Sequence, residues 1–293
     1  MSTADARPLR GRPTDAAHAG EYALTWSDFD SIRDTLFSHA GIVLDETKAP
    51  LVYSRLAKRL RTLGMESFRQ YCALLVSGTG GDERQRMMAA LTTNVTKFFR
   101  EPHHFEYLRS AVLPDLLERA ARGDSVRIWS AGCSMGQEPY SIAFTVLSMM
   151  PSAPAHDIRI LATDIDPNVI AIARNAEYAD DVVADISPEM RRRFLRRKAE
   201  GDWVVADAPR ELIRFNELNL MGAWPMRRPF DILFCRNVVI YFNAETQARL
   251  WGRYADALVP GGTLFIGHSE RVSGPALSTF ETVGLTAYRK ARA

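Results

Sequence analysis

Cysteine is scarce in this 293-residue chain, and long apolar runs are absent. Cys72, Cys133 and Cys235 lie far apart without metal-ligand spacing, so we expect three buried thiols and neither a disulfide framework nor a zinc site. No apolar run approaches the ~20 residues of a membrane-spanning helix. The first residues also lack the apolar core of a signal peptide. These absences predict a soluble, cytoplasmic protein without direct membrane insertion.

The pattern of apolar residues changes along the chain and predicts two folded domains. The first part contains helical patterns without convincing strands, which predicts a small helical bundle. From about residue 124, short β-branched runs such as VRIWSAG alternate with helical patterns, which is typical of βαβ units around a buried parallel sheet. The last run, FETVGLTAYRKA, predicts a terminal antiparallel hairpin strand. We predict a disordered tail (1–21), an all-α domain (22–92), a linker helix and entry segment (93–123), and an α/β domain (124–293) with an insertion at about 187–218.

The chain also lacks the glycine patterns of the common nucleotide sites. The run SAGCSMGQEPY (130–140) lies at the carboxyl end of the predicted strand RIWSAG, where doubly wound sheets bind ligands. Its glycines read Gly132-x-x-x-Gly136, which matches neither the pyrophosphate pattern Gly-x-Gly-x-x-Gly nor the triphosphate pattern Gly-x-x-x-x-Gly-Lys. Glycine permits close approach to the backbone, and the acid Glu138 suits a ligand that carries an ammonium group.

The following strands add groups that suit a nucleoside. The run RILATDID contains Asp164, at the place where a carboxylate accepts hydrogen bonds from both ribose hydroxyls. The alternative role, a helix cap before PNVIAIAR, suits Asp166 better. Asn219, in the run ELNL after a third strand, can bond an adenine edge. A nucleoside with a charged, phosphate-free tail is S-adenosylmethionine, which this spacing predicts as the cofactor.

Basic residues gather in two predicted helices, although the net charge is only +2. The helix at 48–64 has an apolar stripe on one side and four cations on the other: Arg55, Lys58, Arg59 and Arg61. That face is either an ordinary solvated surface or a docking site for an acidic partner. The run SPEMRRRFLRRK (187–198) suits nucleic acid by charge. Without zinc spacing or interleaved aromatic residues, a protein-facing or solvated helix is favoured.

Five runs, in order, resemble the motifs of the CheR-type chemotaxis receptor methyltransferases: LTTNVTKFFR, SAGCSMGQEPYSIA, ATDIDPNVIAIAR, FDILFCRNVVIYF and PGGTLFIGHSE. The resemblance covers about residues 25–290. It implies an α/β, Rossmann-like class I methyltransferase fold with a mostly parallel seven-stranded sheet, preceded by a small helical domain. It also implies methyl transfer from S-adenosylmethionine to glutamate carboxylates on the cytoplasmic helices of methyl-accepting chemoreceptors, which leaves methyl esters and S-adenosylhomocysteine. We expect a monomer that holds no metal and binds no nucleic acid.

The resemblance assigns the cofactor contacts residue by residue: Asn94, Thr96, Arg100, Glu138, Asp164, Asn219, Leu220, Arg236 and Asn237. It also favours receptor docking for the basic face at 55–61. The sequence departs from the family at Gln137, where many relatives carry a second glutamate. The insertion reads RRKAEGDW where relatives that grip a receptor's C-terminal peptide carry a Gly-x-Gly loop. We therefore predict that this chain does not use such a peptide as a tether.

The predicted reaction needs little acid–base chemistry, because a glutamate side chain is already ionised at neutral pH. Arg100 is the candidate to orient the substrate carboxylate through two parallel hydrogen bonds, and Tyr241 is the candidate to line the space around the methyl group. Alternatively, Arg100 forms a surface ion pair and Tyr241 is a core aromatic residue. Adjacent helical positions diverge by ~100°, so we do not expect His103 and His104 to share a metal.

Two other functions stay open. The arginine-rich run supports a nucleic-acid methyltransferase, and Cys235 suggests a nucleophile as in cytosine methylation, although its neighbours offer no partner and a buried thiol is favoured. The second alternative is a cofactor-sensing module without catalysis.

Overall fold

The computed structural model describes residues 16–199 and 201–292. By its internal contacts the chain divides into two compact units, Met1–Ser38 with Val43–Leu91 and His39–Ile42 with Thr92–Ala293. Residues 1–15 of the predicted disordered tail lie outside the described residues. The tail prediction is wrong for Ala16–His18, which form strand β1 and pair with strand β2 (Leu24–Thr25).

The first unit is otherwise helical, as predicted. Its elements are α1 (Trp26–Ala40), the 3-10 turn η1 (Glu46–Lys48), α2 (Ala49–Leu63), α3 (Phe68–Val76) and α4 (Gly81–Leu91). Helix α2 ends where predicted, because Gly64 adopts a left-handed conformation with φ +63°. It begins one residue later than predicted, after the 3-10 turn that Asp45 caps by accepting a hydrogen bond from the Thr47 N–H.

The second unit is built on a seven-stranded sheet in the order β11-β12-β10-β9-β3-β4-β8. Its strands are β3 (Val126–Ala131), β4 (Ile158–Asp164), β8 (Ile213–Glu217), β9 (Phe230–Cys235), β10 (Leu258–Ile266), β11 (Phe280–Gly284) and β12 (Ala287–Lys290). Neighbours from β8 to β10 are parallel, and β12 is antiparallel to both β10 and β11. The sequence prediction of this sheet and of its terminal hairpin is confirmed.

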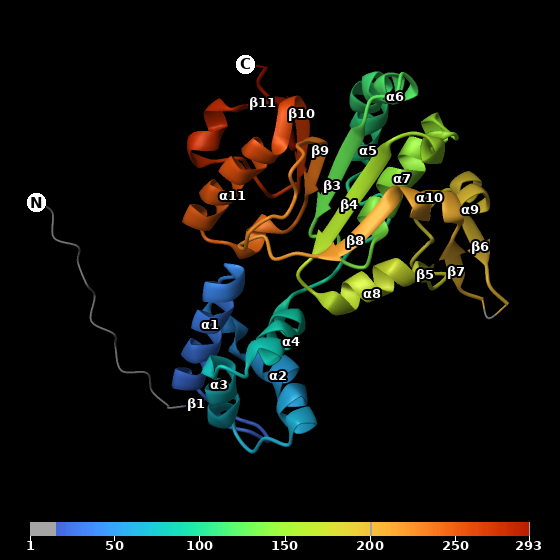
Figure 1. Ribbon diagram of the computed structural model, residues 1–293. Helices are drawn as coiled ribbons and strands as arrows, with labels where there is room; N and C mark the ends of the chain where they lie inside the picture. The colour runs from blue at the N-terminus through green and yellow to red at the C-terminus, as the bar shows by residue number, and fades with distance from the viewer. Residues whose placement is uncertain (1–15, 200, 293) are drawn as a thin grey trace, which may run out of the picture. The chain divides into compact units, whose positions relative to one another are not determined.

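Helices cover both faces of the sheet (Figure 1). The strands are apolar on both sides, so that Ile128 joins one core cluster and its neighbour Trp129 the other. The first cluster receives residues from α7 (Gln137–Met149) and α8 (Pro167–Asn175), and the second from α11 (Ala244–Ala257). A helical stretch joins the site segment to β3: α5 (Pro102–Tyr107), the π-helical turn η2 (Leu108–Val112) and α6 (Leu113–Ala121).

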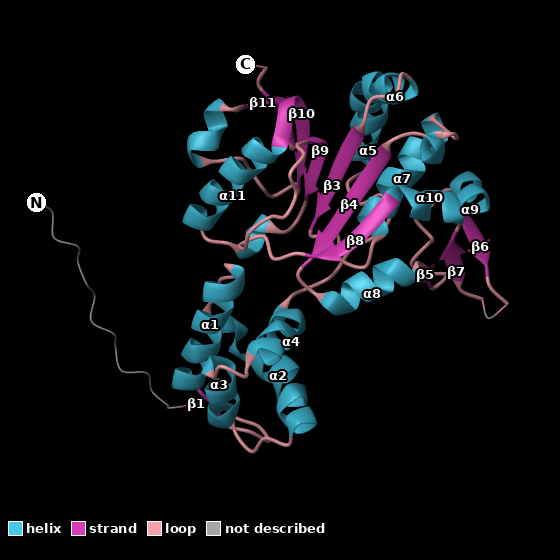
Figure 2. Cartoon of the chain, in the orientation of Figure 1, coloured by secondary structure: helices cyan, strands magenta, loops and turns pink. Residues whose placement is uncertain are grey.

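The insertion forms a separate three-stranded sheet in the order β5-β7-β6 (Figure 2). Its elements are β5 (Glu177–Tyr178), α9 (Pro188–Phe194), β6 (Leu195–Arg197) and β7 (Trp203–Val205), followed by α10 (Asp207–Leu212). The predicted extent was wrong at both ends, since β5 lies before it and Ile213–Glu217 belongs to the main sheet. Strand β8 misled the prediction because it lies at the sheet edge and buries only alternate residues.

Candidate functional site

The predicted site lies where the parallel strands end. The loop after β3 follows the end of the strand closely, because Gly132 adopts φ +85° and a Cβ there would lie 2.4 Å from Cγ2 of Val238. Gly136 adopts φ +96°, and a Cβ there would lie 2.9 Å from that of Ala173. No other residue fits either position without displacing a neighbour, so the loop presents bare backbone at this edge of the sheet.

Asp164 ends β4 with a buried carboxylate. Its Oδ2 accepts the N–H of Ser134 at 2.8 Å and its Oδ1 accepts the N–H of Asp166 at 3.1 Å. Burial raises the pKa of Asp164, and the backbone N–H groups of Asp166, Ser134 and Ile165 oppose that rise. A carboxylate has about four acceptor positions, so Asp164 keeps capacity for a hydroxyl donor. As predicted, Asp166 caps α8, through the Asn168 N–H.

The segment before α5 brings further predicted residues to this edge. The Asn94 side-chain amide donates to Oδ2 of Asp166 at 2.9 Å, and the backbone carbonyl of Asn94 accepts from Oγ of Ser134 at 2.9 Å. Asn94 therefore bonds to both residues, Ser134 and Asp166, whose backbone N–H groups donate to Asp164. Thr96 lies half-buried two residues further on.

Glu138 and Arg236 form a buried ion pair. Oε2 of Glu138 lies 3.2 Å from Nη1 of Arg236, and Oε1 accepts from the Ser130 hydroxyl at 2.6 Å. Burial raises the pKa of Glu138, while Arg236 and Ser130 favour its ionised form. Arg236 also contacts a second carboxylate, since its Nη2 lies 3.2 Å from Oε2 of Glu101. One guanidinium thus joins two acids.

Arg100 and Tyr241 lie at the same strand ends. The Arg100 guanidinium donates to the Val95 carbonyl at 3.0 Å and to Oδ1 of Asn237 at 3.0 Å. Tyr241 is half-buried in the 3-10 turn η4 (Val239–Tyr241) that follows β9. Arg100 is therefore bound to neutral oxygen atoms, and no carboxylate neutralises its charge in these hydrogen bonds.

Asn219 and Leu220 follow β8. The Asn219 side chain donates to the His39 carbonyl and accepts from the Met221 N–H at 2.9 Å, so its amide is already bound within the second unit. Leu220 is 8% exposed and packs in the second core cluster. Any contact of Asn219 with an adenine edge uses its remaining hydrogen-bonding capacity or its backbone.

Sequence analysis missed two acids that hold this site together. Glu101 binds Arg236, Asn237 and His268, and Glu270 accepts the backbone N–H groups of Gly267, Asn237, Val238 and Val239. Glu270 ends the motif PGGTLFIGHSE, and Glu101 directly follows the motif LTTNVTKFFR. Their roles depend on partners far away in the sequence, such as Arg236 for Glu101 and Val238 for Glu270, which no local pattern can indicate.

His103 and His104 lie closer together than the helical spacing predicted. Their ring centroids are 4.2 Å apart, and their nitrogens and the Glu101 carboxylate lie within 4.8 Å of one another. The divergence of adjacent helical positions therefore does not keep these two side chains apart. The guanidinium of Arg236 contacts the same Oε2 of Glu101 that faces His104. That positive charge opposes a metal cation at this place.

The basic face of α2 is partly used within the helical unit. Arg59 makes a two-point ion pair with buried Glu83, Nε to Oε1 at 2.9 Å and Nη2 to Oε2 at 2.7 Å. Arg55 donates to the Ala90 carbonyl at 3.1 Å, Arg61 lies 3.4 Å from Glu21, and Lys58 is exposed. At Arg59 the face is therefore not purely solvated, because α4 supplies its partner.

The second basic cluster is also bonded within its own surroundings. Arg191 donates to the Ile186 carbonyl, Arg193 donates to the Leu147 carbonyl, and Arg197 stacks over Trp203. Cys235 is fully buried, and burial raises its pKa well above the usual value, as it does for Cys133. These contacts favour neither nucleic-acid binding nor a cysteine nucleophile.

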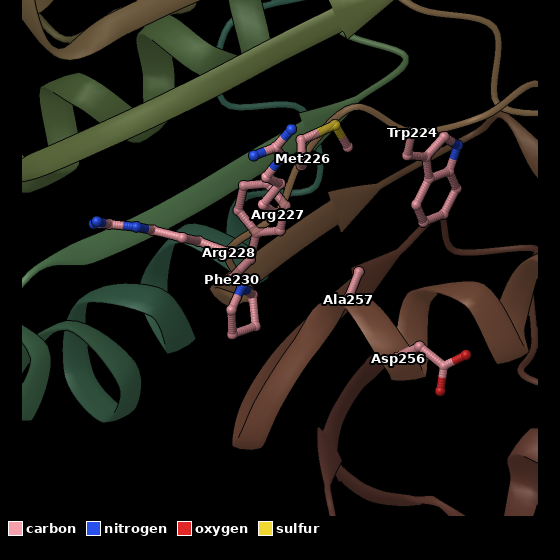
Figure 3. Close-up of a pocket in the computed structure, with 8 residues that line it drawn as sticks. Trp224, Met226, Arg227, Arg228, Phe230, Asp256 and Ala257 are labelled. Carbon is pink, nitrogen blue, oxygen red and sulfur yellow. The ribbon is translucent and has the colours of Figure 1, made fainter.

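A pocket at the other end of β9 has a different character. It is lined by Trp224, Met226, Arg227, Arg228, Pro229, Phe230, Asp256 and Ala257 (Figure 3). Phe230 begins β9, whereas Arg236 follows its last residue. The pocket therefore lies away from the predicted site and contains none of its residues. Among the described residues, no helix combines the length and apolar character needed to span a membrane.

Comparison with known proteins agrees with this geometry. Residues 27–92 match the family described as "CheR methyltransferase, all-alpha domain", and residues 94–289 match "CheR methyltransferase, SAM binding domain". The chain is 54% identical over 261 residues to a "Probable chemotaxis protein methyltransferase" of Rhizobium etli, covering 87% of this chain and 96% of the relative. It is 40% identical to "Chemotaxis protein methyltransferase 2" of Pseudomonas aeruginosa over 92% of this chain and 95% of the relative. The Escherichia coli "Chemotaxis protein methyltransferase" is 39% identical over 86% of each chain.

The residues at the strand ends fit S-adenosylmethionine. Gly132 and Gly136 leave room for close approach to the backbone, Asp164 offers acceptor positions for ribose hydroxyls, and Glu138 offers a carboxylate for an amino group. The family match spans both units, and the relatives are covered over most of their length. The chain therefore belongs to the CheR methyltransferases, and S-adenosylmethionine is its cofactor.

Proposed function

We propose that this enzyme methylates glutamate side chains on the cytoplasmic helical domain of methyl-accepting chemoreceptors. The products are glutamate methyl esters and S-adenosylhomocysteine. The observation that carries the proposal is Arg100, a guanidinium at the strand ends whose hydrogen bonds, within the described part of the chain, go to the neutral oxygens of Val95 and Asn237. It is suited to receive the carboxylate of an acidic substrate. The relatives are named as chemotaxis protein methyltransferases, which supports the proposal.

The chemistry requires alignment more than proton transfer. The bound cofactor supplies a methyl group on a positively charged sulfur. As the new C–O bond to the carboxylate forms, the C–S bond breaks, the sulfur keeps the electron pair, and the two opposite charges cancel. The substrate is already ionised and needs no general base. The roles proposed for this chain are orientation by Arg100 and exclusion of water beside the methyl group by Tyr241.

We further propose that the enzyme acts as a cytoplasmic monomer and finds its receptor through α2. Lys58 and Arg61 are the exposed cations of that face, whereas Arg55 and Arg59 are partly engaged within the unit. In this proposal the enzyme does not bind a receptor's C-terminal peptide as a tether. The loop between β6 and β7 is short, with Gly201 at φ +102° and a hydrogen bond from the Lys198 N–H to the Asp202 carbonyl. Titration with receptor C-terminal peptides tests this, and low-micromolar binding would overturn it.

The main test incubates the protein with S-adenosylmethionine labelled in the methyl group and with cytoplasmic receptor fragments. We expect label on the fragments that mild base releases as methanol, as a methyl ester requires. Base-stable label or label on nucleic acid would contradict the proposal. Arg100→Lys should lower turnover more than cofactor affinity, since it removes the fork but keeps the charge. Lys58→Glu with Arg61→Glu should weaken receptor methylation but spare cofactor binding, with Arg109→Glu, exposed in the second unit, as control.

A further inference from the structure

Glu101, which the sequence did not single out, contacts three residues at the site: Arg236, Asn237 and His268. Its Oε2 lies 3.3 Å from Nε and 3.2 Å from Nη2 of Arg236. Its Oε1 accepts from the backbone N–H and Nδ1 of His268 at 3.2 and 3.0 Å, and lies 3.4 Å from Nδ2 of Asn237. The side chain is only 10% exposed. Burial opposes its ionisation, but Arg236 and His268 outweigh burial and lower its pKa to about 2.

The backbone around Glu101 is held in an uncommon conformation. Glu101 has φ +57°. Phe99, which precedes Arg100, has φ +51°, and Asn237, which accepts a hydrogen bond from Arg100, has φ +59°. Residues other than glycine seldom occupy this region, and those that do cluster at functional sites. The surrounding contacts therefore fix Glu101 against Arg236 at some conformational cost.

The three charged side chains in direct contact, Glu101, Arg236 and Glu138, do not balance, and the nearby guanidinium of Arg100 is bound to the neutral oxygen of Asn237. Glu101 and Glu138 are two carboxylates, and the guanidinium between them, Arg236, has a side chain that is 2% exposed. Buried His104 faces Glu101, but burial, followed by Arg236 and His103, lowers its pKa to about 3, so it is neutral at physiological pH. Two negative groups sharing one cation leave one surplus negative charge. A buried surplus charge is costly unless a ligand compensates it.

We propose that Glu101 is a positioning residue of the cofactor site, which draws the charge of Arg236 towards itself and so keeps Glu138 able to bind the cationic amino group of the cofactor. Without Glu101, Arg236 would pair with Glu138 alone, and that pair would be neutral. The inference rests on the placement of the amino group at Glu138, which the family resemblance implies. Glu101 acts through Arg236 and does not itself touch the reacting atoms.

The test compares two ligands that differ only in the amino group: S-adenosylhomocysteine and its analogue without the α-amino group. Titration calorimetry on the full chain gives the affinity ratio. In Glu101→Gln we expect the affinity for S-adenosylhomocysteine to fall about tenfold, the size of one charge-assisted contact. The affinity for the amine-free analogue should change less than about twofold. Glu106→Gln, an exposed acid on α5, serves as the matched control and should leave both affinities unchanged.

An equal loss for both ligands would mean that Glu101 only maintains the fold, and would overturn the inference, as would no loss for either. Glu101→Asp keeps the charge and should keep a preference for the amine-bearing ligand. If Glu101→Gln does not fold, Glu101→Asp decides. A folded Glu101→Asp that prefers the amine-bearing ligand supports the inference, and one that binds both ligands equally overturns it. If the unmodified protein binds both ligands equally, the amino group does not reach Glu138 and the inference fails. Methylation of receptor fragments, measured in parallel, reports separately on the proposed function.

Discussion

Arg59 and Glu83 meet through two parallel hydrogen bonds inside the helical unit, with Tyr71 donating a third to the same carboxylate at 2.9 Å. Glu83 has a side chain that is 5% exposed, and that of Arg59 is 21% exposed. Arg59, one of the four cations of the proposed receptor-docking face, is thus also part of the internal packing of the helical unit.

Arg59→Met should therefore destabilise the protein. The substitution removes the two-point partner of buried Glu83 and leaves it with the Tyr71 hydroxyl and with Arg86, 3.8 Å away. We expect a cost of about 2 kcal/mol in the free energy of unfolding. Arg61→Met, which removes an exposed cation near Glu21, should change it by less than about 0.5 kcal/mol. Urea denaturation followed by circular dichroism provides the measurement. Equal midpoints for the two variants would refute the structural role, and Glu83→Leu added to Arg59→Met should restore part of the loss.

Asp164→Asn should weaken cofactor binding while the fold persists. Asparagine keeps one acceptor for the N–H of Ser134 or Asp166, but it loses the charge that strengthens hydrogen bonds from ribose hydroxyls. We expect a loss of about 2 kcal/mol in binding free energy by calorimetry with S-adenosylhomocysteine. Asp124→Asn, an exposed loop position, is the control. Unchanged affinity would remove Asp164 from the ribose site.

Glu270→Gln should loosen the turn that carries Arg236 and Asn237. Each carboxylate oxygen accepts two backbone N–H groups, so either orientation of the glutamine amide turns its NH₂ group against two donors. The expected cost is about 2 kcal/mol in stability, accompanied by faster hydrogen exchange at residues 237–239. Glu281→Gln, exposed on β11, should leave both quantities unchanged. Exchange at 237–239 as slow as in the parent protein would contradict the anchoring role.

The buried His104 should make stability decline as the pH falls. Its pKa is about 3 in the folded chain and 6.5 when exposed, so between these values the unfolded chain binds more protons and stability decreases with acidification, by up to about 1.4 kcal/mol per pH unit. Glu101, with a pKa of about 2 against an ordinary 4.5, adds a similar loss only below 4.5. His104→Gln should thus flatten the decline between pH 6.5 and 4.5, whereas exposed His39→Gln should not. Parallel curves for the parent and His104→Gln would disprove this assignment.

Sequence patterns predicted the parts of the fold that depend on local spacing. The buried strands, the helix stop at Gly64 and the cap at Asp166 follow from residues within a few positions of one another. Contacts between distant segments were not predictable in this way. Glu101 and Arg236 are 135 positions apart, and Arg59 and Glu83 are 24 apart on different helices. Strand β8 was assigned to the insertion because an edge strand lacks the continuous apolar run of a central one.

The small sheet of the insertion has a further consequence. Strands β5, β6 and β7 are closed into a sheet by the main chain, with Val205 donating to the Ala176 carbonyl and Ala206 to the Phe194 carbonyl. Such backbone bonds do not depend on which side chains the hairpin carries. At the base of the β6–β7 hairpin, Leu195 and Val205 also pack into the first core cluster, whereas Arg196 and Arg197 are exposed. Sequence changes are consequently tolerated at the exposed tip of the hairpin, around Arg196 and Arg197, but not at its base, where Leu195 and Val205 are part of the core of the unit.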